Sequence, residues 1–245
     1  MKILFLSALE SEAREFKKQY SFHLVDEQKR AALYLFRAKR GETPDEYYWG
    51  ITGVGPKSCR RFIKFISSQA LDFDLVILTG YCGALNQNSQ PGEVLISRKI
   101  HLWSEAKAID LDIPAHSKAG ANIFSSCTVT ILADEEFKMK ILRTHPKAGF
   151  VDMESYYLAE FFQQYSLRLW LVRAVTDGPG FRFPDFAFIQ DSLATLVRKG
   201  LLWPLFLRPS NWGATLALIR NINKAGKGLF RFFSPLIQNG FQDYL

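Results

Sequence analysis

Gly149-Phe150-Val151-Asp152-Met153-Glu154-Ser155 leads into an apolar, helix-like segment that runs to Tyr165. The apolar run Leu169-Trp170-Leu171-Val172-Arg173-Ala174-Val175 follows and closes on Thr176-Asp177-Gly178-Pro179-Gly180. This order predicts a strand, a helix and a second strand, and both strands deliver acidic side chains where they end. Ligands of open α/β sheets bind outside the carboxyl ends of the strands. We therefore expect Glu154 and Asp177 to reach a ligand.

The same alternation of strands and helices extends back to the start of the chain. We expect strands at residues 2–8, 31–38, 47–51, 75–79 and 93–100, and helices at residues 10–19, 56–69 and 134–142. The 245 residues, with 48% hydrophobic and 22% charged, are typical of a globular protein. The fold class predicted is α/β, a three-layer sandwich with a mixed central sheet and a C-terminal helical extension. We divide the chain into an α/β domain at residues 1–190 and a basic, aromatic helical extension of it at residues 191–245.

The positive charge of the chain is concentrated in that extension. The formal net charge is +7, and the segment from Ser192 to the C-terminus has seven basic residues against one acidic residue. Aromatic residues are interspersed among the basic ones, and Pro204, Pro209 and Pro235 are expected to break the helices. A helical cap over the sheet, an oligomer interface and a peripheral membrane contact are the alternatives for this segment. No nucleic-acid-binding motif accompanies it.

Cysteine and histidine usage indicates a protein without a disulfide framework or a metal site. Three cysteines have no metal-type spacing, and the four histidines show no ligand spacing. A reducing, cytoplasmic compartment is the simplest expectation. The apolar run near the N-terminus is followed at once by Glu10 and Glu12, so we interpret it as a strand rather than a signal sequence.

Three glycine-bearing turns follow apolar strands and bring backbone close to a potential ligand. The first is Gly53-Val54-Gly55, the second is Gly80-Tyr81-Cys82-Gly83, and the third is Gly178-Pro179-Gly180. The glycine spacings of dinucleotide-binding and Walker-type loops are not present. No organic cofactor is therefore implied.

Taken in order, these segments resemble the nucleoside phosphorylase and nucleosidase superfamily that includes methylthioadenosine/S-adenosylhomocysteine nucleosidases. The matching pieces are Ala8-Leu9-Glu10-Ser11-Glu12, Gly53-Val54-Gly55, Gly80-Tyr81-Cys82-Gly83-Ala84-Leu85, Val151-Asp152-Met153-Glu154-Ser155 and Arg173-Ala174-Val175-Thr176-Asp177. The resemblance covers residues 1–180 and implies a purine nucleoside phosphorylase-like fold. It also implies a small-molecule nucleoside as the substrate and assembly into a homo-oligomer.

The resemblance implies a role for each acid in cleaving an N-ribosidic bond. Asp177 matches the general acid that serves the purine nitrogen, and such proton transfer typically contributes ~10²–10⁴-fold in rate. Glu154 matches the residue that holds the ribose hydroxyls, with Met153 packed against the sugar, and Glu12 matches the base that activates water. To act as an acid, Asp177 needs burial or a neighbouring like charge. The remaining candidate substrate-binding residues are Asp152, Gly80, Tyr81, Cys82, Gly83, Phe183 and Phe186.

Each of these residues also has a plain structural alternative. Glu154 is suited to the start of the following helix, Asp177 to a turn, and Glu12 to a solvated helix face. Met153 is by default a core residue, and Phe183 and Phe186 are suited to filling the edge of a core.

The sequence favours water over phosphate as the nucleophile. Phosphorylases of the superfamily hold phosphate with arginines, one near the N-terminus and one on the strand before the second glycine turn. Here the first loop is Ser7-Ala8-Leu9-Glu10, and Leu78 stands where the second arginine is expected. A phosphate dianion without these arginines is poorly held, and Glu12 repels it. We expect hydrolysis of a purine nucleoside, of adenosine type and modified at its 5′ position.

Two departures from the family pattern affect the pocket. Tyr81 stands where the family has a small hydroxyl residue, and Cys127-Thr128-Val129-Thr130-Ile131 replaces the Ser-Gly-Asp-x-Phe segment that helps to sandwich the base. The segment after Asp177 resembles the hopanoid-associated phosphorylases through Arg208-Pro209-Ser210-Asn211-Trp212. Two alternatives follow: a phosphorylase acting on a lipid-linked adenosine, and a catalytically silent binding protein at the inner membrane surface.

Overall fold

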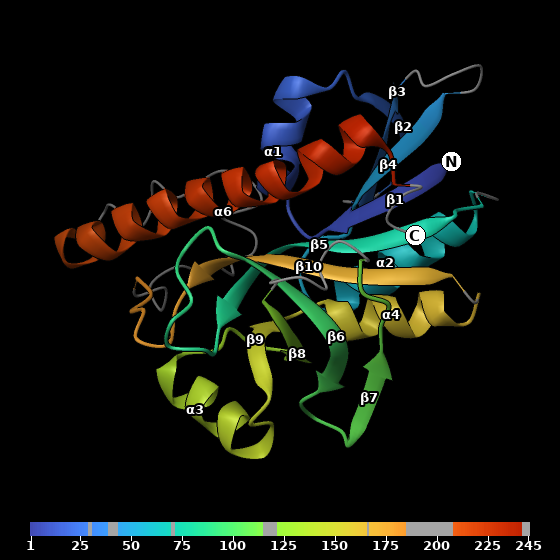
Figure 1. The fold of residues 1–245 in the computed structure, drawn as a ribbon. Coiled ribbons are helices and arrows are strands. Elements are labelled where there is room, and N and C mark those ends of the chain that lie inside the picture. Colours follow the sequence, from blue (N-terminus) through green and yellow to red (C-terminus); the bar gives the residue numbers. More distant parts are fainter. Residues whose placement is uncertain are drawn as a thin grey trace.

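A mixed sheet forms the centre of the computed structural model, which describes residues 1–28, 31–38, 44–69, 72–114, 122–165, 167–184 and 208–241 (Figure 1). Its strands are β1 (Lys2–Ser7), β2 (His23–Gln28), β3 (Ala31–Ala38), β4 (Asp45–Ile51), β5 (Leu75–Ala84), β6 (Val94–Leu102), β7 (Lys107–Asp110), β8 (Ile123–Thr128), β9 (Ala148–Asp152) and β10 (Arg168–Asp177). The helices are α1 (Glu10–Gln19), α2 (Pro56–Ser67), α3 (Glu135–Thr144), α4 (Ser155–Gln163) and α6 (Trp212–Asn239), preceded by the 3-10 turn η3 (Pro209–Asn211).

The strands follow the order β2-β3-β4-β1-β5-β10-β6-β8-β9, and β7 pairs with β6. Four neighbouring strands, β4, β1, β5 and β10, run parallel, whereas β3 with β4 and β10 with β6 are antiparallel pairs. The end of β5 also pairs with β9 through Gly83 and Ala84, so that β5, β10, β6, β8 and β9 close into a ring. The predicted mixed sheet is confirmed, and this ring brings the ends of β5, β9 and β10 together.

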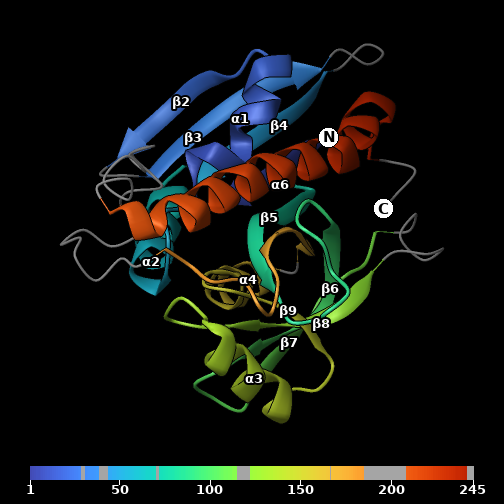
Figure 2. The same ribbon diagram turned by 90° about the vertical axis from the view of Figure 1, so that its left-hand side faces the viewer.

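Helices cover both faces of the sheet and complete three layers (Figures 1 and 2). On one face α2 and α4 bury Phe62, Leu158 and Phe162 against the sheet. On the other face α1 and α6 bury Phe16 and Phe233. Burial of apolar area on both faces supplies the main driving force for this arrangement. The predicted three-layer sandwich is therefore confirmed.

The structure corrects two predictions about where the local elements end. Residues 80–84, predicted as a loop, continue β5, because they pair with β10 and β9. Pro235, predicted to break a helix, lies inside α6. Proline removes one backbone hydrogen bond, but here its neighbours Phe233, Leu236 and Ile237 are buried in the core and hold the helix in place.

The predicted C-terminal helical segment is present as α6, and it forms part of the sandwich. Its buried residues share one apolar cluster with β1, β4 and β10, and Tyr47 of β4 donates a hydrogen bond to the backbone oxygen of Ile237. The proposed division at residue 190 lies outside the described residues. Within the described residues, no helix is long and apolar enough to cross a membrane.

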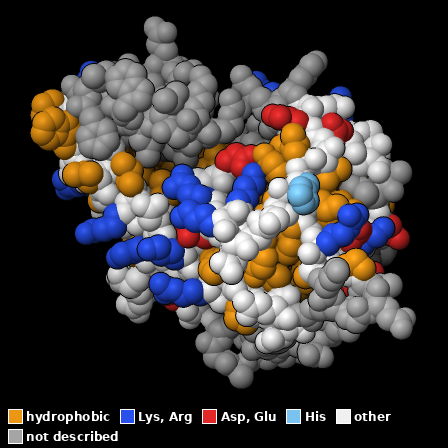
Figure 3. Space-filling model, turned by 90° about the horizontal axis from the view of Figure 1, so that it is seen from above, with side chains coloured by type: hydrophobic (Ala, Val, Ile, Leu, Met, Phe, Trp, Pro, Cys, Tyr) orange, Lys and Arg blue, Asp and Glu red, His pale blue; other side chains and the backbone are white. Residues whose placement is uncertain are grey.

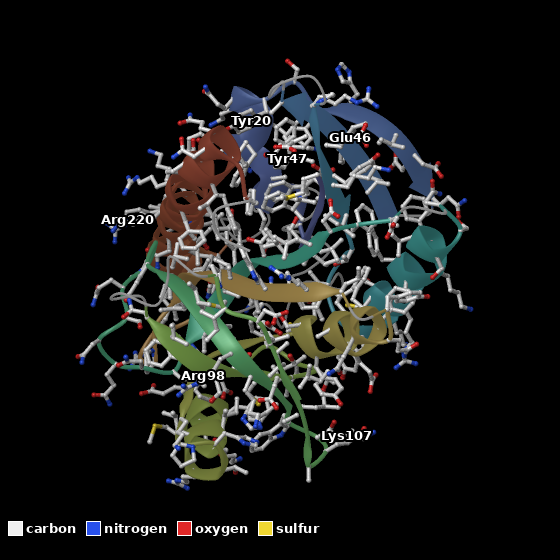
Figure 4. The ribbon with its side chains drawn as sticks, turned by 45° about the vertical axis from the view of Figure 1, so that its right-hand side comes forward. Tyr20, Glu46, Tyr47, Arg98, Lys107 and Arg220 are labelled. Atoms are coloured by element: carbon white, nitrogen blue, oxygen red, sulfur yellow. The ribbon has the colours of Figure 1, made fainter. Side chains whose placement is uncertain are left out.

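The outer face of α6 carries the basic side chains that the sequence concentrates in this segment. Arg220, Lys224, Lys227 and Arg231 are exposed, and Arg220 points away from the sheet (Figure 4). Seen from the side of α1 and α6, lysine and arginine side chains gather beside hydrophobic ones (Figure 3). The helix thus buries its apolar face and presents its charge to solvent, as its amphipathic pattern requires.

Replacing Leu229 by alanine tests whether α6 is part of the core. Leu229 is fully buried, whereas Leu216 on the same helix is 58% exposed. We expect Leu229→Ala to lower the free energy of unfolding by about 2–5 kcal/mol and Leu216→Ala to change it by less than ~0.5 kcal/mol, as measured by urea denaturation. If Leu229→Ala lowered the free energy of unfolding as little as Leu216→Ala, α6 would not contribute to the core.

Candidate active site

The acids singled out from the sequence line one cleft, which encloses about 820 Å³ including its open mouth. Glu12 comes from α1, Glu154 from the residue before α4, and Asp177 from the end of β10. All three are almost completely buried. Segments far apart in the sequence therefore bring three carboxyl groups to the carboxyl ends of parallel strands, where α/β proteins bind ligands.

Most of the other predicted site residues also line this cleft, namely Asp152, Met153, Tyr81, Cys82, Gly83 and Phe183. Gly80 does not line the cleft but lies beside Glu12. Phe186 lies outside the described residues. Among the described residues, no group of three or more His, Cys, Asp or Glu side chains is arranged to hold a metal ion.

Glu12 is held by backbone N–H groups at both of its oxygens. Leu9 donates to Oε2 at 2.7 Å and Tyr81 donates to Oε1 at 2.6 Å. Burial raises the pKa of Glu12, although the nearby Arg173 guanidinium and these hydrogen bonds counteract the rise. A carboxylate with a raised pKa is a stronger proton acceptor. The geometry thus fixes a carboxyl group with raised proton affinity at one side of the cleft.

Glu154 lies at the other side of the same network. Its Oε1 accepts a hydrogen bond from the Gly55 N–H at 2.8 Å, which explains the need for the first glycine-bearing turn. Burial raises the pKa of Glu154 to about 8, opposed by the charge of Arg173. At neutral pH this carboxyl can therefore both donate and accept hydrogen bonds.

Arg173 is a buried cation among the acids, and the sequence analysis did not assign it to the site. It donates to the Thr79 carbonyl at 2.6 Å and to the Ser155 hydroxyl at 2.8 Å, and its Nε lies 3.3 Å from Asp152. An arginine inside an otherwise apolar strand was the available signal, because a charge there must be paired.

Asp152 has its oxygens occupied by the protein. It accepts hydrogen bonds from the Thr128 hydroxyl, from the N–H groups of Glu154 and Ser155, and from the Ser155 hydroxyl. Together with its ion pair to Arg173, these contacts make Asp152 a support for the segment that presents Glu154. Although Asp152 lines the cleft, it is engaged in positioning its neighbours.

Asp177 is paired with a lysine that the sequence analysis missed. Lys138 of α3 places its Nζ 2.5 Å from Asp177 Oδ2, and the Thr176 hydroxyl donates to Oδ1 at 2.8 Å. We expected burial or a like charge beside Asp177; burial is present, but this neighbour is an opposite charge. The signal was that Lys138 precedes Ile141 by three residues and so shares its buried helix face.

The mouth of the cleft is apolar. Ile131 and Leu132 are exposed there, and Leu218 and Ile222 reach it from α6. The Tyr81 hydroxyl donates to the Ser11 carbonyl of α1 at 3.0 Å and lies next to Gly226 of α6. Tyr81 therefore connects the cleft to both helices. A helical extension was predicted for this part of the chain, but only the packing brings α6 to the cleft.

Solved structures with this fold include nucleosidases. A futalosine hydrolase mutant of Helicobacter pylori superposes with a TM-score of 0.66 at 12% identity, covering 96% of this chain and 100% of that one. The methylthioadenosine/S-adenosylhomocysteine nucleosidase of the same organism has a TM-score of 0.65 at 13% identity, covering 96% and 99%. The Neisseria meningitidis nucleosidase, solved with methylthio-immucillin-A, has 0.58 at 16%, covering 90% and 98%.

These similarities show that the chain has the nucleosidase fold over nearly its whole length. No family model matches the sequence, and no curated protein matches it either. The structural similarity therefore confirms the fold that the motifs predict. The sequence identity of 12–16% is too low to assign an activity.

The raised pKa of Glu154 predicts how stability changes with pH. The native state binds this proton more tightly than the unfolded state, so the stability that Glu154 contributes is fully present below its ordinary pKa of 4.5 and is lost as the pH rises toward about 8. In Glu154→Gln this decline should be smaller, as measured by urea unfolding between pH 5 and 9. Glu27→Gln, on the exposed strand β2, serves as the control and should follow the wild type. If the free energy of unfolding changed with pH in the same way in all three proteins, the pKa of Glu154 would not be raised in the folded state.

A side chain at position 80 is expected to destabilise the protein. Gly80 has φ +131°, and a Cβ there would lie 2.5 Å from Glu12 Oε1 and 2.6 Å from Arg173 Nη1. Gly80→Ala should therefore displace this ion network and lower the free energy of unfolding by about 1–3 kcal/mol from backbone strain alone. Gly213→Ala, where no atom lies within 4 Å, is the control. Unchanged stability of Gly80→Ala in urea titrations would show that the site tolerates the extra carbon.

Proposed function

We propose that this protein hydrolyses the N-glycosidic bond of an adenosine-type nucleoside that is modified at its 5′ position, releasing the free base. The observation that carries the proposal is the convergence of Glu12, Glu154 and Asp177, all buried, on one cleft of a nucleosidase-type fold. Burial raises the pKa of Glu12 and of Glu154, and such perturbed acids in a cleft are a physical indication of a catalytic site.

Each acid has a part in the reaction. The bond breaks through a ribosyl cation-like state, which a nearby carboxylate stabilises electrostatically. Asp177 serves the purine nitrogen that takes up a proton, and Glu154 holds the ribose hydroxyls with Met153 against the sugar. Glu12 takes a proton from the attacking water, and its raised pKa favours that transfer.

Water is the proposed nucleophile because the described part of the cleft offers no free cation for phosphate. None of the described residues that line the cleft is lysine or arginine. The two buried cations nearby, Arg173 and Lys138, are paired with Asp152 and Asp177. A phosphate dianion would lack the charged donors that normally hold it.

The apolar mouth supports a substrate with an apolar 5′ substituent. Phe183, Leu132, Leu218 and Ile222 would contact a group that extends from the sugar toward α6. Burial of such a group is favourable by about 25 cal/mol per Å² of apolar surface. A peripheral contact with an anionic membrane remains part of the proposal, and it is supported by the exposed basic residues and by Trp212 and Leu216 on α6.

Replacing Glu12 tests the reaction. Glu12→Gln should lower kcat by about 10²–10⁴-fold for loss of the base, with free adenine and sugar measured by chromatography. Glu15→Gln, three residues later on the same helix and paired with the exposed Lys18, is the control and should retain wild-type activity. Formation of ribose 1-phosphate only when phosphate is added would instead identify a phosphorylase. Failure of the wild type to cleave any nucleoside would favour a silent binding protein.

A further inference from the structure

We infer that the acid of the proposed hydrolysis is a Lys138–Asp177 pair, in which Lys138 supplies the proton that Asp177 passes to the departing base. This inference rests on the proposed function and names a positioning residue that the motifs do not contain. It starts from an unusual feature, a lysine with a side chain that is only 3% exposed, on a helix whose Lys140 is 56% exposed.

The contacts of Lys138 are all directed at the end of β10. Its Nζ donates to Asp177 Oδ2 at 2.5 Å, to the Gly178 carbonyl at 2.9 Å and to the Asp177 carbonyl at 3.4 Å. Three acceptors match the three N–H bonds of an ammonium group. The charge is thus fully partnered and held in one place, although an apolar side chain of similar size would be cheaper to bury.

The position of the pair assigns different tasks to its members. Asp177 lines the cleft, whereas Lys138 is not among the described residues that line it. Lys138 therefore lies behind the carboxyl group and acts through it. Gly83 permits this arrangement, because a Cβ there would lie 2.8 Å from Asp177 Oδ2 and 3.2 Å from Lys138 Nζ.

The ion pair defines which member holds the proton in this proposal. Lys138 Nζ and Asp177 Oδ2 are paired at 2.5 Å, as an ammonium group beside a carboxylate. A carboxylate alone has no proton to give to a leaving base. Two side chains donate to this carboxyl group, the Thr176 hydroxyl and the Lys138 ammonium group, and an ammonium group is much the stronger acid of the two.

The proposed step conserves protons and electrons. The bond between C1′ and the purine nitrogen breaks, and its electron pair moves onto the base. Lys138 first gives one proton to Asp177 and becomes a neutral amine, and Asp177 then passes that same proton to the base and is again a carboxylate. Water adds to C1′ and loses a proton to Glu12, and after product release Glu12 returns a proton to solvent while Lys138 regains one.

The test compares Lys138→Arg and Lys138→Met on two substrates. Arginine keeps the positive charge but does not release its proton. With an adenosine-type nucleoside, both variants should lower kcat by about 10²-fold or more. The leaving group of 4-nitrophenyl ribofuranoside needs no proton. On this substrate Lys138→Arg should therefore keep a kcat within about threefold of the wild-type value, because general-acid catalysis does not contribute to its cleavage. Lys140→Met, on the same helix, should match the wild type on both substrates.

The outcomes separate this inference from the proposed function. Wild-type activity of Lys138→Arg on the nucleoside would overturn the inference alone, because charge without a transferable proton would then suffice. An equal loss on both substrates would also overturn it, since that would show a purely structural role. Absence of cleavage of both substrates by the wild-type protein would overturn the proposed function as well.

Discussion

The buried guanidinium of Arg173 holds the candidate site together. It lies among Glu12, Asp152 and Glu154, and its charge counteracts the rise in pKa that burial causes in both glutamates. Its hydrogen bonds to Thr79 and Ser155 connect β5, β10 and the start of α4. Removing one partner of a buried ion pair typically costs about 3–5 kcal/mol. Folding of the central sheet and assembly of the acids are therefore one process.

The site separates its charges into two groups. Around Arg173, acids outnumber cations, and burial, with the neighbouring charge of Asp152 as a smaller cause, raises the pKa of Glu154 to about 8. At the end of β10, Asp177 is balanced by Lys138 alone. The side of the cleft around Glu12 and Glu154 thus has excess negative charge, which in the proposed reaction would stabilise a developing ribosyl cation.

The closed ring of strands explains why these groups meet. Because β5 pairs with both β10 and β9, the segments that carry Glu154 and Asp177 lie next to the Gly80–Gly83 portion of one strand. Two glycines make this possible, since a side chain at Gly80 would collide with Glu12 and one at Gly83 with Asp177. On the face that α1 and α6 cover, α6 then contributes Leu218 and Ile222 to the lining of the cleft.

Most of the strands and helices and the placement of acids at strand ends could be read from the residues, because hydrophobic periodicity and turn residues are local properties. The strands β2, β7 and β8 were not predicted. The helix at residues 10–19 and the strand at residues 31–38 were predicted with the bounds that the structure has. Burial of Glu12, the partners of Arg173, the pairing of Lys138 with Asp177 and the approach of α6 could not be read in this way. Those contacts join segments tens of residues apart, so they depend on which strands pair and which helix faces pack, and the tertiary structure alone decides that.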